Sequence, residues 1–109
     1  MSEAVQVVLI TAPDAEVGAS LAGALVEEGL AACVNLVPGV RSIYRWEGAV
    51  QDDSEVLLIA KTREALLPVL TARVEALHPY DVPEVIALPI AGGSPAYLAW
   101  LRASSQVRA

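Results

Sequence analysis

The order of strand-like and helix-like segments along this chain predicts an α+β domain in which two helices cover one face of an antiparallel sheet. Two observations support this fold class. Four apolar, β-branched runs are interleaved with two longer stretches whose apolar residues recur at helical spacing, and Gly and Pro mark the boundaries between the segments. A length of 109 residues suits one domain, so residues 1–109 are expected to share a single core.

The first two segments are expected to be a strand over residues 4–11 and a helix that ends just before Gly29. The strand is apolar on both faces, which is typical of a central strand. Pro13 and Asp14 then supply residues that favour a helix start, and the glycine favours a helix stop.

Residues 30–46 and 49–62 are expected to pair as a long hairpin joined by a Glu-Gly turn. Pro38 and Gly39 interrupt the first strand and predict a bulge or kink there. The polar residues 52–54 are expected to form an irregular middle of the returning strand.

The second half of the chain is predicted to hold a helix, a strand and a short final helix. The helix starts near Leu66, where Pro68 sets its first turn, and ends before Pro79. Residues 84–90 form a fourth strand whose proline indicates a sheet edge or a strand end. Ser94 caps the short C-terminal helix. The complete order, βαββαβ with a final helix, is the ferredoxin-like split βαβ arrangement.

Charge and hydropathy exclude several partners and compartments. The formal net charge of −6 opposes binding to a phosphate backbone, so no nucleic acid is expected. Charges, Pro or Gly interrupt every apolar run before it reaches about 18 residues, so no membrane span is expected. The N-terminus lacks the basic region of a signal peptide, and we therefore expect a cytoplasmic protein.

The apolar content predicts an oligomer. Hydrophobic residues make up 55% of the chain and charged residues only 18%, against a usual charged share of about 25%. The split βαβ arrangement leaves one sheet face without helices, although its strands are apolar on both sides. Other copies of the chain are the simplest cover for that face.

Two residues could ligate a metal. His78, the only histidine, follows a helix C-terminus, where it either caps a carbonyl or serves as a ligand or acid–base group near Asp81 and Glu84. Cys33, the only cysteine, excludes an intrachain disulfide. It is either a small buried apolar residue or a soft-metal ligand or redox thiol.

Lys61 and the aromatic residues suggest a different kind of site. Lys61, the only lysine, ends an apolar strand and either keeps its ammonium in water or anchors an anion in a pocket. The aromatic residues near the hairpin turn are typical of interface anchors. No phosphate-binding loop and no Ser–His–Asp arrangement can be recognised in the sequence.

Several motifs together resemble the CutA family of divalent-cation tolerance proteins, in order and with matching spacing from about Val5 to Ala103. They are Thr11-Ala12-Pro13, Leu30-Ala31-Ala32-Cys33-Val34-Asn35, Pro38-Gly39, Ser42-Ile43-Tyr44-Arg45-Trp46-Glu47-Gly48, Lys61-Thr62, His78-Pro79-Tyr80-Asp81-Val82-Pro83-Glu84 and Tyr97-Leu98-Ala99-Trp100-Leu101.

This resemblance implies a homotrimer built like the PII signalling trimers, association with copper or another divalent cation, and no enzymatic reaction. Some family members bind copper through a cysteine in the first strand and a His-His pair before the Pro-Tyr. Ile10 stands at the first of these positions and Leu77-His78 at the pair. Cys33 matches the family's Ala-Ala-Cys-Val motif, and thiolate and imidazole both suit copper.

Two functional hypotheses follow. The first is a trimeric metal-binding protein with His78 and Cys33 as ligands. The second is a PII-like sensor that binds a small anionic metabolite or nucleotide between subunits, through Lys61, Arg45, Trp46, Tyr80 and Glu84. An acylphosphatase-type enzyme has only the shared topology in its favour, because the loop over residues 11–14 holds no basic residue.

Overall fold

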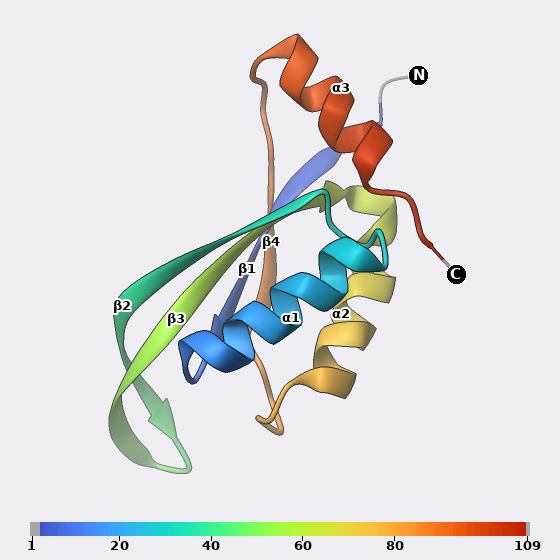
Figure 1. Cartoon of the computed structure of the whole chain (residues 1–109). Coiled ribbons are helices and arrows are strands. Elements are labelled where there is room, and N and C mark those ends of the chain that lie inside the picture. Colours follow the sequence, from blue (N-terminus) through green and yellow to red (C-terminus); the bar gives the residue numbers. More distant parts are fainter. Residues whose placement is uncertain (1–2, 109) are drawn as a thin grey trace.

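The computed structural model describes residues 3–108 and arranges them as a four-stranded antiparallel sheet in the order β2-β3-β1-β4, with two helices across one face (Figure 1). The predicted ferredoxin-like fold is therefore confirmed. The elements are β1 (Val5–Ala12), α1 (Ala15–Glu27), β2 (Cys33–Trp46), β3 (Ala49–Arg63), a 3₁₀ turn (Glu64–Leu66), α2 (Leu67–Leu77), β4 (Val85–Pro89) and α3 (Pro95–Ser104).

β1 is a central strand, as its apolar residues predict. It pairs with β3 on one side and β4 on the other, and its Val8 and Ile10 are fully buried. The helix that follows begins at Asp14, whose carboxylate accepts a 2.8 Å hydrogen bond from the Val17 N–H. This N-cap satisfies one of the free amides in the first turn.

The hairpin of β2 and β3 extends well past the rest of the sheet (Figure 1). Its register shifts between Val37 and Val40, which confirms the predicted irregularity at Pro38 and Gly39.

The predicted irregular middle of β3 is wrong. Asp52 and Asp53 belong to a continuous strand and pair with β2. Arg41 donates two hydrogen bonds of 2.8 and 2.6 Å to the carboxylate of Asp52, and this contact lowers the pKa of the aspartate. Polar side chains interrupt the apolar pattern here, but they pair across the strands and leave the backbone regular.

The remaining elements begin and end close to their predicted positions. Pro68 lies in the first turn of α2, where a missing N–H has no cost. β4 is an edge strand, and Pro89 is its last residue. The Ser94 hydroxyl caps α3 by accepting a 3.3 Å hydrogen bond from the Tyr97 N–H.

The core lies between the sheet and the pair α1 and α2. It combines the helix-facing residues of β1 and β3 with the inner faces of both helices. The fully buried members of this cluster are Val8, Ile10, Ala12, Leu25, Ala31, Leu58, Ala60, Leu70 and Val74. A smaller cluster joins Leu101 of α3 to Val5 and Ala32 at one end of the sheet.

The opposite face of the sheet, which we call the open face, has little cover within the described chain. The strand registers place apolar residues of all four strands on it, among them Val7, Leu9, Val37, Leu57, Ile59, Ile86 and Leu88. Ile86 and Leu88 are about half exposed, at 52% and 51%, and α3 packs only near the Val5 end. None of the helices within residues 3–108 is long and apolar enough to cross a bilayer.

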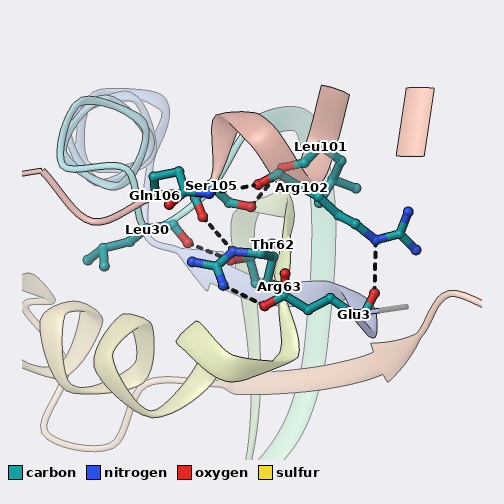
Figure 2. Close-up of polar contacts among 8 residues, drawn as sticks. All are labelled: Glu3, Leu30, Thr62, Arg63, Leu101, Arg102, Ser105 and Gln106. Carbon is teal, nitrogen blue, oxygen red and sulfur yellow. Dashed lines mark hydrogen bonds and ion pairs between the residues drawn. The ribbon is translucent and has the colours of Figure 1, made fainter. Parts of the chain in front are cut away.

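Arg63 ties the two ends of the described chain together (Figure 2). Its guanidinium donates one hydrogen bond of 2.6 Å to the Ser105 carbonyl and one of 2.5 Å to the Glu3 carboxylate. Arg102 donates a further 2.9 Å bond to the Glu3 carbonyl. One planar cation therefore holds the segment before β1 and the segment after α3 against the end of β3.

Candidate functional site

A groove of about 480 Å³ opens where the end of β1, the hairpin and the loop after α2 meet. Its lining, which we call the acidic groove, comprises Thr11, Tyr44, Trp46, Glu55, Pro79, Tyr80, Asp81, Val82 and Glu84. Three of these residues are carboxylates, three are aromatic, and none is Lys, Arg or His. The groove therefore carries negative charge between aromatic walls.

Glu55 and Tyr80 form a part-buried polar contact of the acidic groove. Only 8% of Glu55 is exposed, and its carboxylate accepts a 2.9 Å hydrogen bond from the Tyr80 hydroxyl. Burial, and then the nearby carboxylate, raise the pKa of Tyr80 above its ordinary value. The phenol thus stays protonated at neutral pH and acts as a donor.

Tyr44 forms a second phenol–carboxylate contact beside the first. Its hydroxyl donates to the carboxylate of Asp53, which lies on β3 two residues before Glu55. This hydrogen bond is the main cause that raises the pKa of Tyr44. The hairpin register positions the pair because Asp53 lies opposite Ser42, two residues from the tyrosine on the same face of β2.

His78 is buried at the end of α2 and links the loop to β1. Its Nε2 lies 2.8 Å from the Thr11 carbonyl oxygen, and its Nδ1 accepts a 3.1 Å hydrogen bond from the Tyr80 N–H. Because Nδ1 accepts, Nε2 carries the proton that it donates to the carbonyl. The imidazole also packs against the Tyr80 ring, with centroids 4.6 Å apart. Both ring nitrogens are therefore engaged in holding the loop.

Cys33 lies at the other end of the open face. It pairs with Lys61, whose Nζ lies 3.7 Å from the Cys33 Sγ and also donates to the Asn35 side chain. Lys61 is opposite Val7 of β1, four residues before the Thr11 that His78 contacts. Four residues of strand span about 13 Å.

The two predicted metal ligands, Cys33 and His78, thus lie at opposite ends of the sheet. Within residues 3–108 no group of three His, Cys, Asp or Glu residues could hold a metal ion. The described residues of a single chain therefore do not form a complete metal site. That Cys33 and His78 act as ligands stays a prediction.

The structure brings together part of the set predicted for an anionic ligand. Trp46, Tyr80 and Glu84 line the acidic groove. Lys61 lies with Cys33 instead, and the Arg45 guanidinium donates a 3.3 Å hydrogen bond to the Gly48 carbonyl in the hairpin turn. The two basic residues are thus outside the groove lining.

Sequence reasoning did not select Thr11, Tyr44 and Glu55 as site residues. The strongest available signal was an acid, Glu55, at the start of an apolar run on β3. Its partner Tyr80 is 25 residues further along the chain, so no local pattern connects the two.

The structure is a ferredoxin-like α+β domain with a long projecting hairpin and an acidic groove. The family model described as "CutA1 divalent ion tolerance protein" matches residues 6–104. The chain belongs to this divalent-cation tolerance family, and the resemblance found in its motifs is confirmed.

Relatives from plants and bacteria share more than half of the residues. "Divalent-cation tolerance protein CutA" from Thermus thermophilus is 61% identical over 97 residues, which cover 89% of this chain and 94% of that protein. "Protein CutA, chloroplastic" from Arabidopsis thaliana is 61% identical over 100 residues, 92% of this chain. The match covers 55% of the Arabidopsis protein, so this chain spans about half of its length.

Solved structures confirm the architecture. CutA1 from Oryza sativa superposes with a TM-score of 0.93 at 57% identity and covers 96% of each chain. The divalent cation tolerance protein from Thermus thermophilus has a TM-score of 0.91 at 58% identity, covering 94% of this chain and 99% of that one.

Proposed function

We propose that this protein is a homotrimer that binds divalent cations, copper among them, and contributes to metal tolerance without catalysing a reaction. Membership of the divalent-cation tolerance family supports the metal. The non-catalytic role agrees with the names of its relatives, which describe tolerance and no reaction.

The observation that carries the proposal is the open face. Apolar side chains from all four strands share it, and a helix packs near only one of its ends. Burying such a surface against other copies recovers roughly 25 cal/mol for each Å² of apolar area. A threefold arrangement covers the open face of every copy and agrees with the PII-like assembly that the motifs imply.

Metal binding is proposed to depend on this assembly. One described chain lacks three converging ligands, whereas Cys33 lies on the open face, so a trimer contains three copies of its thiol near the subunit boundaries. Thiolate is a preferred ligand of copper. His78 is the less available donor, because ligation would require it to release either the Thr11 carbonyl or the Tyr80 N–H.

Copper titration of matched variants tests the ligand assignment. Calorimetry with copper(II), repeated anaerobically with copper(I), is performed on the wild type, Cys33→Ser, His78→Ala and Ser20→Ala. We expect Cys33→Ser to weaken copper(I) binding at least tenfold, because it removes the soft ligand. Ser20→Ala, a change at an exposed position of α1 on the helical side of the sheet, should leave the affinity unaltered.

Identical isotherms for the wild type and Cys33→Ser would remove the thiol from the site. A loss confined to His78→Ala in a folded trimer would instead assign the imidazole as the ligand.

The proposed location is the cytoplasm. A chain with one cysteine cannot form an internal disulfide, which suits a reducing compartment. Cell fractionation of the native protein tests this location.

An anionic ligand receives no specific support from the groove. Its lining contains three carboxylates and no basic side chain, and the lysine chosen for that role lies beside Cys33. Metal binding is therefore the one function that we propose.

A further inference from the structure

We propose that the acidic groove binds a small organic cation, an alkylammonium ion, at a site separate from Cys33. The proposal goes beyond metal binding, because the groove lies at the other end of the open face and its chemistry differs. Two independent features carry it: a buried carboxylate that has no cationic partner, and aromatic faces that no internal cation covers.

Glu55 supplies the first feature. The residue as a whole is more than nine-tenths buried, at 8% exposure. The Tyr80 hydroxyl bonds one carboxylate oxygen, Oε2. Among residues 3–108 no Lys, Arg or His forms an ion pair with it, and no donor bonds its second oxygen, Oε1. A carboxylate withdrawn from water to this extent favours an incoming positive charge.

The aromatic walls supply the second feature. Within a single chain, Tyr44, Trp46 and Tyr80 line the groove and remain 41%, 45% and 36% exposed. The described aromatic contacts are ring–ring pairs, and none places an Arg or Lys over these three rings. Exposed aromatic faces attract cations through the ring quadrupole, and alkylated ammonium groups use this attraction most effectively.

The shape and donor set of the acidic groove favour an organic cation over the alternatives. A volume of about 480 Å³ suits a small molecule. A bare metal ion needs several converging ligands, and the residues between 3 and 108 bring no three of them together. An anion would meet Glu55, Asp81 and Glu84 without a basic side chain in the lining.

Choline, with its neutral carbon isostere 3,3-dimethyl-1-butanol, provides a direct test on the protein in its native assembly. The two tryptophans give an internal control in ¹H–¹⁵N spectra, since Trp46 lines the groove and Trp100 lies on α3. At constant ionic strength we expect choline to shift the Trp46 indole signal saturably and to leave the Trp100 signal unchanged. The neutral isostere should bind at least tenfold more weakly.

Matched variants then test whether the negative charge of Glu55 contributes to choline binding. Glu55→Gln keeps an acceptor for the Tyr80 hydroxyl but removes the negative charge, and should weaken choline binding about tenfold. Glu27→Gln removes an exposed carboxylate from α1 and should leave the affinity unchanged. Trp46→Leu, followed through the Tyr80 amide signal, should weaken binding severalfold.

Three outcomes would overturn the proposal: no saturable shift in the wild type, equal binding of the isostere, or equal weakening by both Gln variants. Copper affinity provides a separate readout. It should be the same in Glu55→Gln and the wild type, and a tenfold loss would make the groove a metal site instead. Failure of the copper assignment at Cys33 leaves the choline result unaffected.

Discussion

Gly29 shows how closely the chain packs at the end of α1. Its φ of +76° lies in the left-handed region that favours glycine. A Cβ at this position would fall 1.6 Å from the carbonyl oxygen of Gln106. The neighbouring Glu28 carbonyl accepts a 2.8 Å hydrogen bond from the Arg108 N–H. The segment after α3 therefore lies directly over this glycine.

Gly29→Ala should lower the free energy of unfolding by about 2 kcal/mol or more, because a strained backbone and a steric clash add together. Gly48→Ala is the matched control, since Gly48 has a similar φ of +79° and no atom within 4 Å of an added Cβ. Gly48→Ala should lower the free energy of unfolding by only about 1 kcal/mol. Urea unfolding at one protein concentration measures both, and equal losses would contradict the close packing.

Tyr80 predicts a dependence of stability on alkaline pH. Burial and the Glu55 carboxylate raise its pKa in the folded protein above the ordinary value of 10.0. The unfolded chain therefore releases this proton first, so stability is retained below pH 10 and falls as the pH rises beyond it.

Tyr80→Phe removes that contribution and should show a shallower loss of stability than the wild type above pH 10. Chemical unfolding followed by circular dichroism at several pH values measures the two slopes. Parallel curves for the two proteins would show that Tyr80 is not the titrating group.

His78 illustrates what the sequence can establish about a single residue. Its place after a helix predicted either a capping role or a ligand role, and both remained open. The structure shows hydrogen bonds at both nitrogens, to Thr11 and Tyr80. Thr11 is 67 residues away in the chain, so no local spacing could have identified it as a partner.

Among the elements, the junction of β3 with the two chain ends depends on Arg63. Its side chain is only 15% exposed and serves two acceptors that are far apart in sequence. Arg63→Ala should lower the free energy of unfolding by about 1–3 kcal/mol, because the Ser105 carbonyl and the Glu3 carboxylate lose a charged donor. Arg63→Lys should recover only part of the lost free energy of unfolding, since an ammonium lacks the planar array of N–H donors of a guanidinium.

Arg41→Ala is the matched control for Arg63→Ala. Arg41 and Asp52 form an equally well-aligned pair, but on the exposed outer hairpin, where such pairs add little. Denaturant unfolding compares the free energies of unfolding of the two Ala variants. Hydrogen exchange at residues 105–108 measures whether the segment after α3 detaches from the end of β3. Equal effects of both substitutions would contradict a special role for Arg63.

The sequence predicts the elements well because each has its own local signal. Asp14, Gly29, Pro68 and Ser94 mark helix ends through backbone chemistry that acts within a few residues. The error over residues 52–54 has a physical cause: alternation of apolar residues reports burial, and the outer hairpin remains a strand while both faces are polar.

The site was predictable only in part because register is not visible in a single strand. Trp46, Tyr80 and Glu84 lie near turns and reach the same groove. Lys61 was grouped with them, yet it lies six residues from Glu55 along β3, about 20 Å in an extended strand. Only the pairing of β3 with its neighbours shows that the two residues belong to opposite ends of the sheet.

At the scale of the whole molecule, we expect one charged side chain introduced on the open face to dissociate the proposed trimer. Ile86→Asp places a carboxylate on that face and should convert the proposed trimer to monomers in light scattering after size exclusion. Val69→Asp is the matched control, because Val69 is similarly exposed, at 50% against 52%, but lies on α2. It should leave the mass at three times that of one chain.

A wild type with the mass of a single chain would refute the trimer. A trimeric Ile86→Asp variant would move the subunit contact away from the open face.

The position of β1 at the centre of the sheet also has a consequence for biosynthesis. Its partners, β3 and β4, end at Arg63 and Pro89. At about 5–20 residues per second, a ribosome needs roughly 4–15 s to translate from the end of β1 to the end of β4. Until β3 is complete, a strand that is apolar on both sides has neither neighbour, and until β4 is complete one of its edges stays unpaired. The nascent chain therefore exposes apolar surface of the kind that chaperones recognise.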